Sequence, residues 1–277
     1  MIDRGEKSDD VAPGIPAVEA VTLLYDRHVS MIRGLVHRMC GDRDLVDEIV
    51  QDTFLEAQRS WSGFEGRSKA SSWLGAIAVR QCQRRWRKRA GEPDRIPSFE
   101  ELLPFGETTS SLIPGPGETP LETSIRREAA DAIHRSILEL PDEFRVPLLM
   151  KEILELSVAD VAEALALNPQ TVKSRLHRAR LKMREAMRER LPQGPAVDPA
   201  YDKQTCIDLM CAKLDAQDSG RAFPVANEIL CDRCLSVFKE LDLAVDLCRV
   251  QGLPEPSMED REHLLQQLFE AGRGPTD

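Results

Sequence analysis

The sequence predicts an all-α protein in which two small helical domains are joined by a flexible linker and followed by a helical C-terminal extension. Three observations predict this class. Apolar residues recur at steps of three and four, aromatic residues make up only 5% of the chain, and no convincing run of alternating β-branched residues is visible. With 277 residues, 42% of them hydrophobic, the chain is long enough for two or three small cores.

The most informative stretch is residues 140–190, in which two helix starts follow one another closely. Ser157 precedes Asp160 by three residues, which is an N-terminal capping signal. Asn168 stands before Pro169, a cap residue followed by proline at the first helical position. Two helices that begin about eleven residues apart predict a helix-turn-helix.

The second of these helices has an apolar stripe and a polar face. The stripe would pack on the first helix and consists of Val172, Leu176, Ala179 and Met183. The polar face carries Gln170, Thr171, Lys173, Ser174, Arg175, His177 and Arg178. Between residues 173 and 190, eight basic residues oppose two acids. An ordinary solvated helix is the alternative, but caps, turn and basic helix together favour recognition of DNA in the major groove.

Residues 140–190 resemble region 4 of bacterial sigma-70-type sigma factors of the extracytoplasmic-function group. The resemblance lies in the segments LPDEFRVPLL, SVADVAEAL and NPQTVKSRLHRAR. It implies a domain that binds the minus-35 promoter element and the flap of the polymerase β subunit. The implied minus-35 contacts are Gln170, Thr171, Lys173, Ser174 and Arg175, with Arg178 as a phosphate partner.

Three further helices are predicted from Val18 to Cys40, from about Asp44 to Ser60 and from about Lys69 to Arg89, the first of them ended by Gly41. This block resembles region 2 of the same family in GDRDLVDEIVQDTFLEAQRSW and FEGRSKASSWLGAIA. In the family an acidic helix here binds the clamp helices of the polymerase β′ subunit. The implied core-polymerase contacts are Asp47, Gln51 and Asp52.

The loop and the third helix would then bind the minus-10 element, where a base leaves the stack and the exposed strand is held by cations and stacking groups. The resemblance places the base pocket at Phe64, Arg67, Lys69, Ser71 and Ser72. Cations that would follow the phosphates are Arg80, Arg84, Arg85, Arg87 and Lys88. We expect Trp73 in the core. The family commonly has Asn where Arg80 stands, so the minus-10 preference of this chain is expected to differ.

A Pro-, Gly- and acid-rich linker over residues 91–120 separates a region 2 domain at residues 18–90 from a region 4 domain at residues 121–192. Its composition predicts a disordered tether. The resemblance implies instead a linker that follows the RNA exit path of the polymerase. Both descriptions hold if the linker is loose in the free protein and ordered in the holoenzyme.

The extension over residues 200–277 contains five of the seven cysteines. CIDLMCAKLDAQDSG and ANEILCDRCLSVFKEL resemble the zinc-binding fold of anti-sigma factors, although Asn227 stands at the position of a histidine ligand. The candidate ligands for zinc or another metal ion are Cys206, Cys211, Cys231 and Cys234, with Cys248 as a substitute. Two alternatives remain open, namely a metal-free remnant with buried thiols and a thiol redox switch.

Charge differs strongly along the chain. The formal net charge is −10, of which −7 falls on residues 201–277, whereas residues 80–89 contain six bases and no acid. An acidic appendage after a basic DNA-binding domain suggests regulation in cis, in which the extension covers either domain and a metal or oxidation changes its docking.

The predicted function is that of a sigma factor, a non-enzymatic subunit that gives core RNA polymerase its promoter specificity. No P-loop, H-E-x-x-H pair or nucleophile elbow is present, and no cofactor is expected to be required. The polar start MIDRGEKSDD and the lack of a membrane-length apolar run favour the cytoplasm. Expected partners are core polymerase, promoter DNA and an anti-sigma factor, with no membrane. The alternatives are a helix-turn-helix repressor or activator that acts without polymerase, and a metal-storage or redox enzyme.

Overall fold

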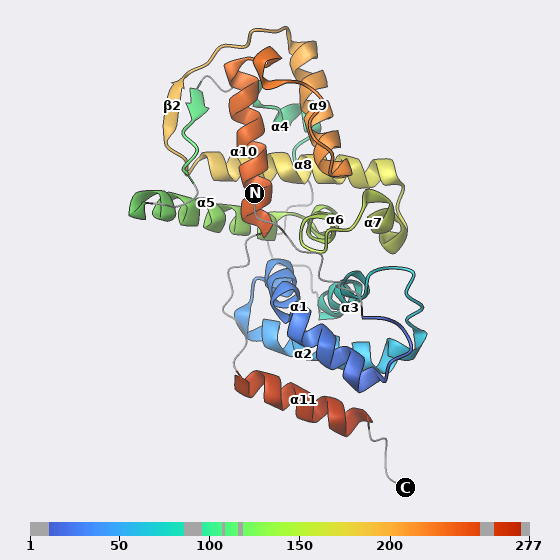
Figure 1. Ribbon diagram of the computed structural model, residues 1–277. Helices are drawn as coiled ribbons and strands as arrows, with labels where there is room; N and C mark the ends of the chain where they lie inside the picture. The colour runs from blue at the N-terminus through green and yellow to red at the C-terminus, as the bar shows by residue number, and fades with distance from the viewer. Residues whose placement is uncertain (1–10, 86–95, 107–108, 116–118, 250–257, 273–277) are drawn as a thin grey trace. The chain divides into compact units, whose positions relative to one another are not determined.

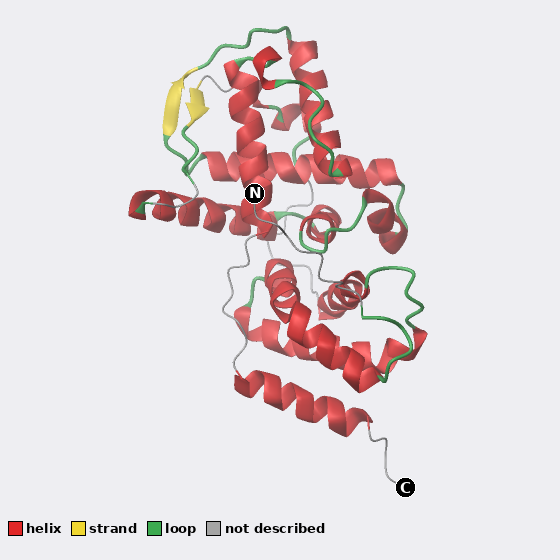
Figure 2. Cartoon of the chain, viewed as in Figure 1, coloured by secondary structure: helices red, strands yellow, loops and turns green. Residues whose placement is uncertain are grey.

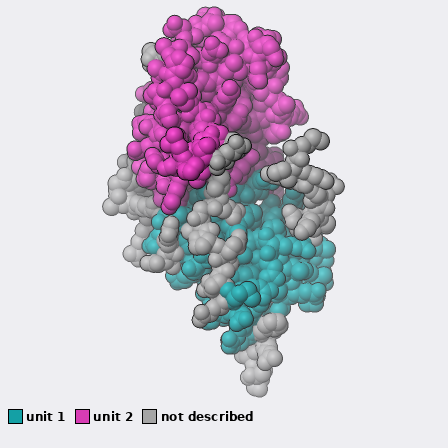
Figure 3. All heavy atoms as spheres, turned by 60° about the vertical axis from the view of Figure 1, so that its left-hand side comes forward, with its two compact units in different colours: residues 1–88, 153–155, 251–277 teal, residues 89–152, 156–250 magenta. Residues whose placement is uncertain are grey.

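Helices make up almost all of the regular structure in this computed structural model, which confirms the all-α prediction (Figure 2). The chain divides into two compact units (Figure 3). Unit 1 holds residues 1–88, 153–155 and 251–277, and unit 2 holds residues 89–152 and 156–250. The structure describes residues 11–85, 96–106, 109–115, 119–249 and 258–272.

Unit 1 is built on a bundle of α1 (Ala17–Cys40), α2 (Arg43–Ser60) and α3 (Ala70–Arg85), with α11 (Met258–Gly272) packed against α2 and α1 (Figure 1). Gly41 ends α1 as predicted, because its φ of 71° is easily reached without a side chain. The bundle closes around large apolar side chains that exclude solvent: Leu24, Ile32, Leu35, Ile49, Phe54, Leu74 and Ile77.

A 3-10 turn (η1, Trp61–Gly63) carries the chain from α2 toward α3 and starts an aromatic cluster. Trp61 stacks on Phe64 at 5.0 Å between ring centroids, and Trp73 meets both rings at 5.6 and 5.2 Å. The indole N–H of Trp61 donates to the carbonyl oxygen of Ile15 at 2.9 Å. Trp73 is thus part of this cluster with its side chain half-buried, at the edge of the core rather than inside it as predicted.

Unit 2 contains α5 (Pro120–Glu139), α6 (Asp142–Glu152), α7 (Val158–Leu165) and α8 (Pro169–Arg188). Both predicted caps of the helix-turn-helix are confirmed. Ser157 and Asp160 form a reciprocal capping box, and the Asn168 side chain accepts a hydrogen bond from the backbone of Gln170 at 2.8 Å. Between the two helices Ala166 adopts the left-handed conformation at φ 52°, which makes the turn.

The remaining elements of unit 2 include three helices that pack against α8 and two short strands (Figure 1). They are α4 (Phe99–Leu102), η2 (Pro104–Gly106), β1 (Thr109–Ser111), β2 (Gln193–Ala196), α9 (Lys203–Ser219), η3 (Asn227–Ile229) and α10 (Asp232–Arg249). Strands β1 and β2 pair antiparallel. Leu102 and Leu103 of the linker are buried in one core with residues of α8, α9 and α10. The described part of the linker is thus folded, an order that its composition did not predict.

No helix in the described part of the chain combines the length and the apolar character that crossing a bilayer requires.

Candidate functional site

The N-terminal half of α8 presents an open polar face. Five predicted minus-35 contacts line one shallow hollow together with Glu143 and Phe144 of α6, and these five are Gln170, Thr171, Ser174, Arg175 and Arg178. Amide, hydroxyl and guanidinium groups therefore lie side by side at the start of a capped helix. These are the groups that recognise base edges in the major groove.

The two arginines of this face are held by neighbours within unit 2. Arg175 pairs with Glu143 at 2.7 Å. Arg178 donates to the carbonyl oxygens of Ile96 and Pro97 at 2.6 and 3.0 Å, and its guanidinium lies 4.6 Å from the Phe144 ring centroid. The linker thus positions the predicted phosphate partner.

Lys173 lies on a different face of α8 from the other minus-35 candidates. At about 100° per residue it is turned roughly 120° from the middle of the open face, toward α9. There its ammonium group donates to Asp215 at 2.8 Å, and this hydrogen bond raises the pKa of Lys173. The structure therefore brings five of the six minus-35 candidates together and separates Lys173 from them.

Two of the basic residues counted toward the DNA surface are buried instead. Arg180 donates to Glu152 at 2.9 and 2.7 Å and to Asp218 at 2.5 Å, and Arg184 pairs with Glu240 at 2.5 Å. Burial lowers the pKa of Arg180, but the two carboxylates outweigh it and raise the pKa overall. Counting charges along the helix was wrong for these two, because the extension supplies buried acids as their partners.

A triad on α8 and α9 resembles a metal site only in composition. Ligand atoms of His177, Asp215 and Asp218 all lie within 4.8 Å of one another. Asp215 already pairs with Lys173, and Asp218 pairs with Arg180 and with the His177 ring at 2.9 Å. The arrangement is an ion-pair network that fastens α9 to α8.

On α2, all three candidate polymerase contacts have partners inside unit 1. Asp47 pairs with Arg33 of α1, while Asp52 pairs with Arg85 of α3 at 2.5 Å. Gln51 donates from its amide to the side-chain oxygen of Gln267 on α11. Asp47 remains the most exposed of the three carboxylate and amide groups, with 63% of its side chain accessible.

The phosphate-tracking candidates of α3 are placed differently from one another. Arg80 and Arg84 are exposed. Arg85 turns to α2 and pairs with Glu48 at 2.7 Å as well as with Asp52; burial lowers its pKa, and these two acids raise it overall. Arg87 and Lys88 lie outside the described residues.

The minus-10 pocket candidates are split between core and surface. Phe64 and Ser72 are buried, at 7% and 8% exposed, because Trp61 and Trp73 enclose this segment. The outward-facing candidates are Arg67 and Lys69, with Ser71 half-buried. This conformation does not gather the five in one open pocket.

Two family models match segments of this chain. The family model described as Sigma-70 region 2 matches residues 24–92, and the model described as Sigma-70, region 4 matches residues 130–183. The chain is 32% identical over 171 residues to the ECF RNA polymerase sigma factor SigW of Bacillus subtilis, which covers 62% of this chain and 90% of that protein.

The chain belongs to the extracytoplasmic-function (ECF) sigma factors. The RNA polymerase sigma-H factor of Pseudomonas aeruginosa is 28% identical, over 70% of this chain and 95% of that protein. The ECF RNA polymerase sigma-E factor of Haemophilus influenzae is 29% identical, over 58% of this chain and 84% of that protein. Neither of the two family models extends past residue 183, so the extension of this sigma factor lies outside them.

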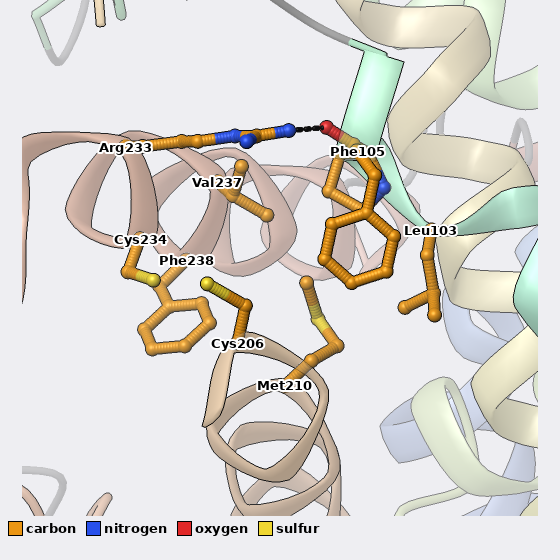
Figure 4. A pocket seen from close by; sticks show the side chains of 9 residues that line it. Leu103, Phe105, Cys206, Met210, Arg233, Cys234, Val237 and Phe238 are labelled. Atoms are coloured by element: carbon orange, nitrogen blue, oxygen red, sulfur yellow. Dashed lines mark hydrogen bonds between the residues drawn. The ribbon is translucent and has the colours of Figure 1, made fainter. Parts of the chain in front are cut away.

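In the extension, three of the four candidate metal ligands come together. The thiol of Cys234 hydrogen-bonds with the thiols of Cys206 and Cys231. Cys206 and Cys234 also line an apolar pocket with Met210 and Phe238 (Figure 4). We call Cys206, Cys231 and Cys234 the thiol cluster. All the cysteines are free of disulfide bonds.

The three thiols of the cluster differ in acidity. Burial and the two neighbouring sulfurs raise the pKa of Cys234 to about 12, and burial raises the pKa of Cys206. Burial acts in the same direction on Cys231, but backbone hydrogen bonds, among them those from Arg233 and Cys234 at the start of α10, lower its pKa overall. Cys231 is therefore the first thiol of the cluster to lose its proton.

Cys211 does not join the thiol cluster. Five residues beyond Cys206 on α9, it is turned about 140° around the helix axis. Burial raises its pKa, and the charged groups that act on it are Asp208 and Asp215 rather than another sulfur. Cys248 lies fourteen residues beyond Cys234 on α10, roughly 21 Å along the helix, so it cannot supply the missing fourth ligand either.

Sequence reasoning missed the partners that hold these surfaces in place. Asp215 and Asp218 on α9, and Gln267 on α11, gave no separate signal because they lie in segments of mixed polarity. A pattern could have indicated α11, since Leu264 and Leu268 are one turn apart in a segment with many polar residues.

Proposed function

We propose that this sigma factor binds core RNA polymerase through α2 and recognises the minus-35 element with the open face of α8. The observation that carries the proposal is this open face. Gln170, Ser174 and Arg175 share it, whereas α9 and α10 pack about 120° away around the helix. The extension is thus compatible with entry of α8 into a major groove.

Helix α3 would supply the minus-10 contacts. Arg80 and Arg84 are exposed along it and are suited to phosphates of a separated strand. Phe64 would have to leave its stack with Trp61 to hold an extracted base. We therefore expect the loop before α3 to change conformation when the promoter opens.

In vitro transcription tests this function. Core polymerase and DNA from upstream of the gene are combined with the full-length protein, with a Ser174→Ala/Arg175→Ala variant, or with a Glu163→Ala control on an exposed position of α7. We expect a specific transcript with the wild type and the control, and a strong loss with the double variant. Specific DNA binding by the chain alone, without any transcript when core enzyme is added, would instead support a repressor or activator.

We also propose that the thiol cluster binds a thiophilic metal ion such as Zn²⁺ and regulates the sigma factor in cis. Support comes from three sulfurs that share hydrogen bonds, one of them with a lowered pKa. Thiolate-to-metal bands on addition of Co²⁺ would report binding. They should persist in Cys211→Ser and disappear in Cys234→Ser. An oxidant-induced Cys206–Cys234 disulfide in a protein that takes up no metal would favour the redox switch.

A further inference from the structure

Helix α11 is the one described element of the extension that belongs to unit 1. It packs along α2 and also contacts α1 (Figure 1). Leu264 and Leu268, one helical turn apart, are 4% and 0% exposed. Since the other described leucine of this helix is only half-buried, these two form a narrow apolar edge that unit 1 covers.

Polar contacts fix the register of α11 on unit 1. The amide of Gln58 on α2 donates to the carbonyl oxygen of Leu268 at 2.7 Å, and Gln51 donates to the side chain of Gln267. At the other end Arg261 donates twice to Asp26 of α1, at 2.8 and 2.9 Å. The contact is therefore specific as well as apolar.

The face of α2 under α11 includes candidate polymerase contacts. At about 100° per residue, Asp47, Gln51 and Gln58 fall within roughly 40° of one another around the helix. Asp52 is turned about 100° away from Gln51, toward its partner Arg85 on α3. Helix α11 thus contacts Gln51, and a partner that binds Asp47 and Gln51 on this face would meet α11.

We propose that α11 is an intramolecular competitor of core RNA polymerase, which must displace α11 to bind α2. This inference rests on the proposed role of α2. Among the described residues of α11, the buried apolar side chains are Leu264 and Leu268 on one helix edge, and a partner with a larger interface can displace such a contact. If only molecules with α11 undocked bind polymerase, the apparent dissociation constant equals the intrinsic dissociation constant divided by the fraction of undocked molecules.

The test compares variants of the full-length protein in binding to core polymerase. Leu268→Glu places a charge at the buried edge of α11, and Gln266→Glu places the same charge on its exposed side. If α11 is docked in nine of ten molecules, Leu268→Glu lowers the dissociation constant about tenfold. Gln266→Glu leaves it unchanged. Amide hydrogen exchange in the free protein should rise in α11 only for Leu268→Glu.

A charge exchange gives a second test that buries no new charge. Arg261→Glu opposes Asp26 and should lower the dissociation constant for polymerase. The double variant Arg261→Glu/Asp26→Arg again has opposite charges at these two positions, and its dissociation constant for polymerase should return toward the wild-type value. A purely additive result, with no restoration in the double variant, would overturn the docking contact.

The outcomes separate this inference from the proposed function. Suppose that hydrogen exchange shows α11 to be released in Leu268→Glu. If this variant and the wild type then bind polymerase with equal affinity, the inference is overturned and the sigma role is left intact. If Leu268→Glu does not release α11, the apolar edge does not hold the helix and the inference fails. If no variant binds core polymerase, the proposed function fails and the inference with it.

Discussion

Helices α8 and α2 both carry candidate binding residues, but the extension meets the two helices differently. The polar face of α8 lines a shallow hollow with α6, whereas α11 packs along α2 and contacts Gln51 there. The extension thus contributes to both units in different ways. In unit 2, helices α9 and α10 of the extension pack on α8 away from its open face. In unit 1, helix α11 packs on α2, which polymerase is proposed to bind.

The two attachments differ in strength as well as in place. Helices α9 and α10 share a continuous apolar core with α8 and add buried ion pairs such as Arg180 with Asp218. The described residues of α11 contribute two buried leucines, one buried hydrogen bond from Gln58, and polar contacts that are exposed or half-buried. This contrast agrees with the proposal that polymerase displaces α11, while α9 and α10 stay packed in unit 2.

The largest expected effect follows from removing the buried cation of α8. Arg180→Met leaves Glu152 and Asp218 without their shared partner, and we expect a loss of about 3 to 5 kcal/mol in the free energy of unfolding. Urea unfolding followed by circular dichroism measures it. Lys182→Met, on the exposed pair with Glu185, is the control and should change stability by less than about 1 kcal/mol. Similar losses in the two variants would contradict the buried network.

The next effect depends on pH. Burial raises the pKa of Asp218, but the hydrogen bond from His177 and the charge of Arg180 outweigh it and lower the pKa below that of the unfolded chain. The stabilisation is therefore complete well above pH 4 and is lost as the pH falls through the folded-state pKa. Asp218→Asn should cost about 2 kcal/mol at pH 7. The difference in unfolding free energy between the wild type and Asp218→Asn should become smaller at acidic pH. A difference that stays constant down to pH 3 would contradict this account.

A smaller effect is expected at the open face of α8. Arg175→Ala should weaken binding to promoter DNA by about 1 to 3 kcal/mol, because a guanidinium that contacts a base edge is lost. Binding of the holoenzyme to promoter fragments with and without the native minus-35 sequence measures it. Lys182→Ala, a cation farther along α8, should weaken both fragments alike. Equal sensitivity of the two fragments to Arg175→Ala would exclude base recognition by this residue.

The smallest effect concerns the face where α9 meets α8. Asp215→Asn releases Lys173 from its ion pair, so one more cation becomes available to DNA phosphates. We expect promoter affinity to rise a few-fold and the salt dependence to steepen by about one phosphate contact. Asp208→Asn on the same helix is the matched control. An unchanged salt slope would show that Lys173 does not reach DNA.

Local sequence signals predicted where the helices begin and end. Which basic residues of α8 are available to bind DNA depends instead on acidic residues that the fold brings close to them. The capping pairs at Ser157 and Asn168 fixed where α7 and α8 begin, and Gly41 fixed where α1 ends. The sequence could not reveal that Lys173 and Arg180 form ion pairs with acids of the extension, because these partners lie roughly 40 residues away along the chain. Only the fold brings these groups together.

The same limit applies to the cysteines and to α11. The spacing of Cys231 and Cys234 places both thiols at one helix end, and this was visible in the sequence. That Cys206 joins them while Cys211 does not depends on the rotation of α9 against α10. The pairing of Gln51 with Gln267 joins residues more than 200 positions apart, a contact that no local pattern encodes.

Amide hydrogen exchange of the wild-type protein, alone and with core polymerase, tests the central contrast most directly. We predict that α11 is protected in the free protein and loses protection when polymerase binds, while α2 remains protected because polymerase replaces α11. Helices α9 and α10 should keep their protection in both states. Full protection of α11 in the polymerase complex would contradict the account.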